Sequence, residues 1–323
     1  MEVVIVNTNR RSTDVAILSS EGKVVDFRRV AGPLPPSTRE LMRLITSSVL
    51  DMTLSSKAGV RPSCLGMSVL DIEENEKGKL AKDISNYIAL EDVIVMDDLE
   101  ASYFSAFRRE KGLLVYSGLR AGVYTLEGER LVSSGGLGYI LDGEASTYWV
   151  GAEALRFAVR ASDGRSIPTV LSSTLINWLS LSDIGAIAKW VANATPQEIA
   201  SLAPLVMEAY EAEDKVASLI VERSLRSIAD MAWTVFRRSA FAGEVKVAFR
   251  GSVFERSKKA RKDLISRLSE LGIKAVESAR VALPTLGIAV ATFERAGLEV
   301  GPELERRLLS ELTSEQVMSS SKG

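Results

Sequence analysis

The sequence predicts an α/β protein of two lobes, in each of which helices flank a mixed β-sheet. Three observations predict this fold class. The 323 residues exceed what one ordinary hydrophobic core holds and suit two domains. A pattern of strand, turn, strand, turn and strand opens the chain and returns from Leu113. Each time, helical segments alternating with short buried strands follow, which is typical of α/β proteins.

In the first half, short runs of apolar and β-branched residues stand between turn formers, as in strands. The predicted strands are Val3–Val6, Asp14–Leu18, Lys23–Arg29, Cys64–Leu70 and Val93–Met96. Two other segments repeat apolar residues at helical spacing, and Ser37 or Thr38 is a suitable cap for the first. The predicted helices run from this cap to about Leu54 and from Leu99 to Arg109.

The second half repeats the order of elements without repeating the residues. The predicted strands are Leu113–Ser117, Gly122–Leu126, Glu129–Ser134, Val245–Phe249 and Lys274–Glu277. From Thr147 to Arg238 the chain is expected to be mostly helical. Turn formers break this stretch at Asp163–Arg165, Ser182–Asp183 and Thr195–Pro196. Two more helices are expected, at Ser257–Gly272 and Leu286–Ala296.

The lobes follow from this repeat. Residues 1–114 are expected to form the N-terminal lobe, completed by a C-terminal helix at 285–312. Residues 115–284 are expected to form the C-terminal lobe with a helical insertion. The polar, serine-rich residues 313–323 predict a flexible tail.

Composition excludes several classes of function. The formal net charge is −2, and the densest basic run, Lys258–Lys262, lies in an amphipathic helical pattern, so no nucleic-acid partner is expected. No apolar stretch reaches the roughly 20 residues of a membrane helix, so no membrane partner is expected. The chain opens directly on a strand pattern rather than on a secretory signal, which predicts a cytoplasmic location.

The chain contains no histidine and one cysteine, Cys64. Nucleophilic sites that need a histidine base and metal sites that need histidine are therefore excluded. Acid–base chemistry falls first to carboxylates. A metal, where one is used, would be an oxygen-preferring ion such as Mg²⁺.

Several segments resemble the N-acetylglucosamine kinases. Gly135–Gly151 resembles their glycine-rich sugar signature, Phe249–Phe254 their adenosine motif, and Pro284–Ala289 their C-terminal motif. The chain is thus identified as a member of the broad family that includes these kinases and the BadF/BadG/BcrA/BcrD ATPases. This resemblance implies the two-lobed, actin-like ATPase fold, which is ribonuclease H-like, with ATP between the lobes and a sugar deeper in the cleft. The iron–sulfur ATPases use paired cysteines, so the lone Cys64 favours the sugar-kinase branch.

The same resemblance implies roles for individual residues. Asp98 would be the catalytic base toward a sugar hydroxyl, although a helix N-cap or a partner of the helix dipole is an equally good interpretation. Gly136, Glu144 and Ser146 would bind the sugar, although Glu144 could equally be a solvated charge. Gly251 and Ser252 would contact the nucleotide, although this loop also suits an ordinary turn with a serine cap. The family has Asp where this chain has Gly143, which leaves the identity of the sugar open.

Both phosphate loops depart from the family. The first, at residues 7–13, has lost every glycine, and Asn7 replaces the Asp that holds Mg²⁺ through water. The second, at residues 118–121, has lost its hydroxyl side chains. Nucleotide contacts here would come from Asn7, Arg10, Thr13, Gly118 and Arg120. The arginines can offset phosphate charge, lie exposed in their turns or fill the space of the nucleotide.

Two functions therefore remain open. The first is a divergent carbohydrate kinase, similar to N-acetylglucosamine kinase, which uses ATP with Mg²⁺ and binds a sugar and a nucleotide. The second is a non-catalytic relative, a pseudokinase with a binding or regulatory role, because charge neutralisation is most of phosphoryl-transfer catalysis. A homodimer is left open.

Overall fold

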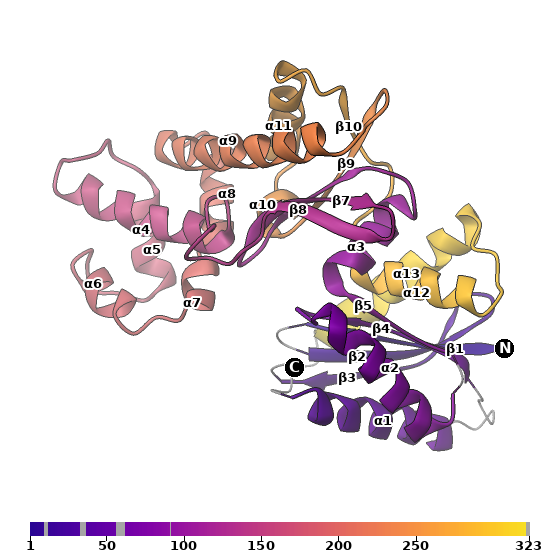
Figure 1. Ribbon diagram of the computed structural model, residues 1–323. Coiled ribbons are helices and arrows are strands. Elements are labelled where there is room, and N and C mark those ends of the chain that lie inside the picture. The colour runs from indigo at the N-terminus through magenta and orange to yellow at the C-terminus, as the bar shows by residue number, and fades with distance from the viewer. Residues whose placement is uncertain (10–11, 33–36, 56–61, 91, 321–323) are drawn as a thin grey trace. The chain divides into compact units, whose positions relative to one another are not determined.

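The computed structural model describes residues 1–9, 12–32, 37–55, 62–90 and 92–320 (Figure 1). The chain forms two compact units, residues 1–108 with 280–323 and residues 109–279. From the sequence, the chain was expected to pass from one lobe to the other after residue 114 and to return after residue 284. The chain enters the second unit earlier because the strand β6 (Leu113–Ser117) is central to that unit's sheet.

The first unit contains a mixed five-stranded sheet in the order β3-β2-β1-β4-β5. Its first three strands form an antiparallel meander, and β4 and β5 continue the sheet parallel to β1. The strands are β1 (Glu2–Thr8), β2 (Ser12–Ser19), β3 (Val24–Ala31), β4 (Pro62–Val69) and β5 (Asp92–Asp97). The sequence predicted all five. Helix α1 (Thr38–Ser55) precedes β4, and α2 (Glu74–Ile88) connects β4 to β5.

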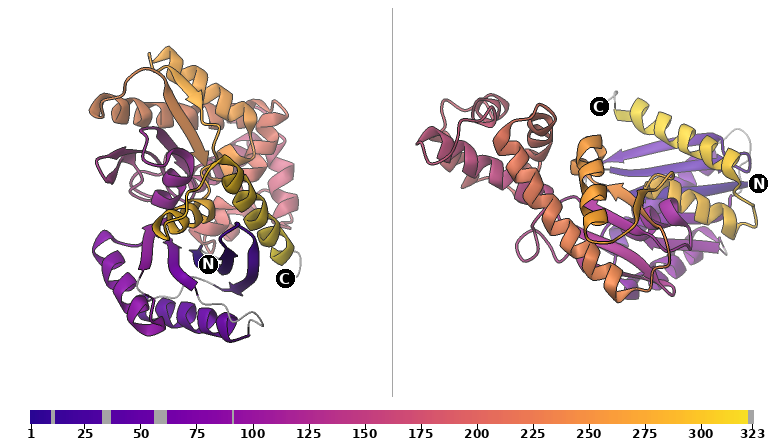
Figure 2. Two further views of the ribbon diagram at one scale, coloured as in Figure 1. Left: turned by 90° about the vertical axis from the view of Figure 1, so that its right-hand side faces the viewer. Right: turned by 90° about the horizontal axis from the view of Figure 1, so that it is seen from above.

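Alternate side chains of this sheet enter two different cores. Val4 and Val6 pack with α1 and α2, whereas Val3 and Ile5 pack with α3 (Asp98–Phe107), α12 (Pro284–Arg295) and α13 (Pro302–Ser320). Figures 1 and 2 show α1 and α2 on one side of the sheet and α12 on the other. The central strand β1 is therefore buried on both faces, as a parallel sheet between two helix layers requires.

Helix α2 was not predicted. Its sequence is strongly charged, and only Leu80 and Ile84 are buried, so its apolar stripe is too narrow to give a clear helical period. The helix nevertheless covers the edge of the sheet at β4 and β5, with both buried residues in the core of that face.

The C-terminal segment forms two helices where the sequence suggested one. Gly297, at φ +79°, follows the end of α12 and reverses the chain. Helix α13 then runs to Ser320, through most of the segment expected to be a flexible tail. Leu308 and Leu312 anchor α13 in the core. The sequence underestimated this helix because its last turns carry few apolar residues.

The second unit contains another mixed five-stranded sheet, in the order β10-β9-β6-β7-β8. Strands β6, β7 and β8 form an antiparallel meander, and β9 and β10 continue it parallel to β6. The remaining strands are β7 (Ala121–Glu127), β8 (Arg130–Gly135), β9 (Val245–Arg250) and β10 (Ala275–Glu277). The predicted repeat of the first sheet's pattern is thus confirmed.

The helices of the second unit surround one large core built on the 24-residue helix α9. They are α4 (Thr147–Ser162), α5 (Leu171–Trp178), α6 (Ala186–Val191), α7 (Pro196–Ala200), α8 (Ala203–Glu211), α9 (Lys215–Arg238), α10 (Ser252–Glu255) and α11 (Lys258–Glu270). The predicted breaks between them are confirmed; at Thr195, for example, a capping box starts α7. Across the described ranges, no helix combines the length and the apolar character that a membrane crossing needs.

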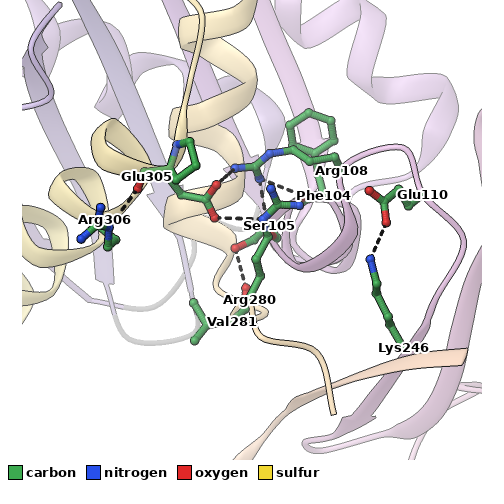
Figure 3. A network of polar contacts seen from close by, with 10 residues as sticks. Phe104, Ser105, Arg108, Glu110, Lys246, Arg280, Val281, Glu305 and Arg306 are labelled. Carbon is green, nitrogen blue, oxygen red and sulfur yellow. Dashed lines mark hydrogen bonds and ion pairs between the residues drawn. The ribbon is translucent and has the colours of Figure 1, made fainter. Parts of the chain in front are cut away.

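One carboxylate contacts both residues at which the chain leaves the first unit and returns to it. Glu305 on α13 lies 2.7 Å from Arg108, the last residue before the second unit, and 3.4 Å from Arg280, the first residue after it (Figure 3). The hydroxyl of Ser105 also donates to the carbonyl of Val281 at 2.6 Å. The two connections are therefore tied together within the first unit.

Candidate active site

Polar side chains of the first unit gather at the carboxyl ends of the parallel strands β1, β4 and β5. Asn7 and Thr8 end β1, Ser68 lies opposite Asn7 near the end of β4, and Asp98 follows β5. All four are buried; the exposed fraction is 7% for Asn7 and 2% for Asp98. Ligands of open α/β sheets bind at this edge, so the position itself favours a functional site.

Asp97, not Asp98, caps helix α3. The Asp97 carboxylate accepts a hydrogen bond from the amide of Leu99 at 2.9 Å, and Glu100 accepts from the amide of Asp97 at 2.8 Å. These bonds form a capping box. The interpretation of Asp98 as the helix N-cap is therefore wrong, and its buried carboxylate lies in the first turn of α3 without a capping role.

The Thr8 side chain connects the ends of β1 and β4 by hydrogen bonds. Its hydroxyl donates to the carbonyl of Ser68 at 3.3 Å and accepts from the amide of Leu70 at 3.1 Å. Ser68 was missed by the sequence prediction, because a serine within an apolar strand carries no motif. Its place beside the end of β1 is the signal that could have identified it.

The turn between β1 and β2 is closed by Asn9. The backbone amide of Asn9 donates to the carbonyl of Ser12 at 2.9 Å, and the Asn9 side-chain oxygen accepts from the backbone amide of Ser12 at 3.0 Å. Thr13, a predicted nucleotide contact, is buried in β2 opposite Thr8. Arg10, the other predicted contact in this turn, lies outside the described residues.

Beside Asn7, a buried carboxylate is already neutralised. Asp14 on β2 is the register partner of both Asn7 on β1 and Arg29 on β3. Two guanidinium nitrogens of Arg29 each lie 2.7 Å from an oxygen of Asp14. This hydrogen bonding raises the pKa of the Arg29 guanidinium, against the opposite effect of burial. Asp14 is thus committed to an ion pair within the sheet.

Mg²⁺, which the kinase resemblance implies, does not fit the donors at the end of β1. Asn7 offers a neutral amide there, and the carboxylate of its neighbour Asp14 is bound to Arg29. Mg²⁺ is usually held by carboxylates and by phosphates of the substrate. Within the described part of the chain, no three acidic or cysteine side chains are grouped so that they could hold a metal ion. We therefore assign no protein-bound metal to this edge.

In the second unit, three predicted segments meet at the end of β6. A Cβ on Gly251 would lie 2.0 Å from the carbonyl oxygen of Ser117, so only glycine fits there, with φ +100°. The Ser117 hydroxyl donates to the carbonyl of Ala145 at 2.6 Å. The amide of Thr147, in the first turn of α4, donates to the carbonyl of Gly118 at 2.8 Å. The structure thus brings the second phosphate loop, the adenosine motif and the sugar signature into contact.

The second phosphate loop is a tight turn in which the amide of Gly118 donates to the carbonyl of Arg120 at 3.0 Å. Arg120 is half-buried. A Cβ on Gly118 would lie 2.1 Å from the Tyr116 hydroxyl, so a larger residue here would displace the Tyr116 side chain. Ser252 begins the four-residue helix α10 and is half-buried. These residues hold one another in place with little room for larger side chains.

The predicted sugar residues differ in what they do locally. Ser146 is fully buried and caps α4, its hydroxyl accepting from the amide of Trp149 at 3.1 Å. Gly136, at φ +93°, packs so closely that a Cβ would lie 2.5 Å from the Tyr124 hydroxyl. Glu144 is exposed. Of these three predicted residues, Glu144 alone presents an exposed side chain.

A separate cavity of about 450 Å³ lies in the helical region of this unit, between α4, α6 and α7. Apolar residues such as Leu155, Val159 and Ile187 line it, together with Arg156 and Arg160. None of the predicted site residues contributes to it. This cavity is therefore not part of the candidate active site.

Solved structures with similar folds include proteins described as sugar kinases. A proposed N-acetylglucosamine kinase from Chromobacterium violaceum matches with a TM-score of 0.64 and 18% identity, over 90% of this chain and 98% of that one. Another, from Porphyromonas gingivalis, matches with a TM-score of 0.66 and 17% identity, over 88% and 97%. At such low identity, these matches show the fold, which is that of the actin-like ATPases.

Among curated proteins, the N-acetylmuramic acid/N-acetylglucosamine kinase of Clostridium acetobutylicum is 28% identical over 168 residues, 51% of this chain and 55% of that protein. The chain spans about half the length of the curated relatives it matches. The profile of the BadF/BadG/BcrA/BcrD ATPase family matches residues 38–281, which contain Ser68, Asp98, the sugar signature and the adenosine motif. On this match, over most of its length, the chain belongs to the BadF/BadG/BcrA/BcrD ATPase family, within which it is related to carbohydrate kinases.

Proposed function

We propose that this protein transfers the γ-phosphoryl group of ATP to a hydroxyl of a sugar or amino sugar, with Asp98 as the general base. One observation carries this proposal: Asp98 is a buried carboxylate at the carboxyl end of a parallel strand, and its neighbour Asp97 does the capping. At this position the carboxylate can accept a proton from a bound hydroxyl, which is the role of a general base.

The expected chemistry is a single displacement. The carboxylate of Asp98 takes the proton of the sugar hydroxyl as that oxygen bonds to the γ-phosphorus, and the bond from this phosphorus to the bridging oxygen of ADP breaks. The first turn of α3, which contains Asp98, favours negative charge.

The relatives support the class of substrate. Two curated relatives are named as N-acetylglucosamine kinases, one of them also as an N-acetylmuramic acid kinase. These names extend to this chain as a proposal, because each match covers about half of the relative. N-acetylglucosamine is therefore the first sugar to test.

A second function, favoured by one observation, is binding without turnover. Asn7 is a neutral side chain at the end of β1, beside an Asp14 that Arg29 neutralises. Weak charge neutralisation slows phosphoryl transfer more than it weakens sugar binding. In that case the protein would bind the sugar and regulate a partner.

The two functions are separated by ADP release from ATP in the presence of Mg²⁺, with N-acetylglucosamine or a panel of hexoses as acceptor. Asp98→Asn should lower kcat at least about 100-fold, because a positioned base contributes roughly 10²–10⁴ to the rate. Asp97→Asn is the matched control, since asparagine caps helices as well as aspartate does. It should retain nearly full turnover.

Equal turnover in the wild type and Asp98→Asn would refute the role of Asp98. Sugar binding without any sugar-dependent ADP release, measured by calorimetry on the same protein, would support the non-catalytic function instead.

A further inference from the structure

Two buried polar atoms at the ends of β1 and β4 have no hydrogen-bond partner among the residues that the structure describes. They are Oδ1 of Asn7 and Oγ of Ser68. The two residues are register partners on adjacent parallel strands, and Ser68 is fully buried. Because buried polar groups in native proteins are nearly always paired, such a pair of atoms indicates a place for a ligand.

The first turn of α12 lies toward this same edge. Arg295, the last residue of α12, pairs with Asp92 at the start of β5 at 2.8 Å. A Cβ on Gly66, in the middle of β4, would contact Thr292 and Ile288 of α12. The helix therefore runs antiparallel to β4 and β5, and its N-terminus points to the carboxyl ends of the strands.

Both residues lie on the face of the sheet that α12 covers. Gly66, which contacts α12, stands two residues before Ser68, so their side-chain positions point to the same face. Asn7 stands two residues after Ile5, which packs with α12. The residue before the helix, Leu283, supplies no side-chain cap. A 12-residue helix without such a cap directs the positive end of its dipole at this edge.

At the end of β1 the charges favour an anion over a metal ion, since the carboxylate of Asp98 lies two strands away, after β5. Asn7 is neutral, and Asp14 on the neighbouring strand is paired with Arg29. Asn7 also adapts to either kind of partner, because its oxygen and nitrogen exchange places when the amide turns over. With the nitrogen turned toward Ser68, the side chains of Asn7 and Ser68 both act as donors.

We propose that Asn7, Ser68 and the first turn of α12 form a phosphate-binding subsite that needs no divalent cation. Asn7 Nδ2 and the Ser68 hydroxyl donate to phosphate oxygens, and the helix dipole offsets part of their charge. As a nucleotide subsite this rests on the proposed function. The specific claim is that Asn7, in the position of a metal-positioning carboxylate, makes nucleotide binding independent of Mg²⁺.

Calorimetric titration of ADP into the full chain tests this claim, once with excess Mg²⁺ and once with excess EDTA. The wild-type dissociation constant should change less than about threefold between the two conditions, because Asn7 offers no carboxylate to recruit the cation. Asn7→Asp should bind ADP at least about tenfold more tightly with Mg²⁺ than with EDTA, since it restores that carboxylate.

Ser68→Ala tests the subsite without altering charge. It should weaken ADP binding about five- to tenfold in both conditions, because a donor to a charged oxygen is lost. Ser63→Ala is the matched control at the other end of β4, where the Ser63 hydroxyl meets the Glu2 carbonyl at 3.3 Å. It should bind ADP as the wild type does.

A wild-type affinity that rises tenfold with Mg²⁺, or unchanged binding by Ser68→Ala, would overturn the subsite. Inorganic pyrophosphate separates this failure from that of the proposed function. Pyrophosphate binding that Ser68→Ala weakens, together with no binding of ADP, would leave the subsite standing and remove the kinase proposal. Absence of binding by both ligands would overturn the subsite as well.

Discussion

Arg108 and Glu305 form an ion pair of 2.7 Å in which the two side chains are only 15% and 14% exposed. The guanidinium also donates to the carbonyl of Phe104 and lies over its ring (Figure 3). The same Glu305 also pairs with Arg280. One carboxylate on the C-terminal helix therefore holds the residue at which the chain leaves the first unit and the residue at which it returns.

Glu305→Gln should therefore destabilise the first unit by about 1–3 kcal/mol, as expected when one partner of a largely buried ion pair is removed. Burial already lowers the pKa of the Arg108 guanidinium, and Glu305 is the main group that opposes this effect. Arginine stays charged in proteins, so the variant would leave its charge poorly compensated. Urea unfolding followed by circular dichroism measures the change.

Glu303→Gln is the control for that measurement. It lies on the same helix and meets Arg307 at 3.7 Å, but the Glu303 side chain is 85% exposed. Its loss should change the free energy of unfolding by less than about 0.5 kcal/mol. An equal effect of both substitutions would show that burial of the Arg108–Glu305 pair adds nothing.

Asp97→Ala should cost about 1 kcal/mol of folding free energy, because it removes the carboxylate that caps α3. Asp97→Asn should cost much less, since its side chain can accept the same hydrogen bond. Thermal unfolding of the two variants and the wild type checks the order. A greater loss in Asp97→Asn would contradict the capping role.

Gly66→Ala should destabilise the protein by about 1–3 kcal/mol, because its Cβ would lie 1.8 Å from the Thr292 hydroxyl oxygen. The double variant with Thr292→Ala should regain part of that loss. Gly78→Ala is the matched change in open space within α2, and it should stabilise by about 0.5–1 kcal/mol. Denaturant unfolding curves of the four proteins test this order.

Cys64 should be nearly inert in the native protein. Burial raises the pKa of its thiol to about 11, and the negative charge of Asp92 adds to this effect. Because the thiolate is the reactive form, labelling at pH 8 should be about two orders of magnitude slower than in urea. The native rate should still rise with pH above pH 9, where the rate of the unfolded chain levels off. Equal native and unfolded rates would contradict this.

The sequence was most informative where a local pattern of apolar residues and turn formers is strong. Every strand of the described residues was predicted, because runs such as Val3–Val6 are apolar on both faces and bounded by turn formers. Helix α2 was missed because its stability depends on Leu80 and Ile84 in a charged sequence, and tertiary packing supplies what local pattern does not.

Some residues of the candidate site were predicted from the sequence and others were not, for a related reason. Asp98 and Gly251 stand next to strand ends in recognisable motifs, so their positions could be read from the sequence. Which of two adjacent aspartates caps α3 could not be, because Asp97 and Asp98 have the same chemistry and differ only in backbone position. Ser68 became visible only when strand pairing placed it opposite Asn7.

The hairpin of β1 and β2 also bears on how this chain has been able to change. Its pairing runs without interruption from Glu2 opposite Ser19 to Thr8 opposite Thr13, and Asn9 closes the turn on Ser12. A shift of this pairing by one residue would turn each side chain of β2 to the opposite face and exchange its two hydrophobic faces. A residue such as Asn7 can thus change its chemistry at the end of β1 only while the pairing of the two strands, on which both cores depend, is kept.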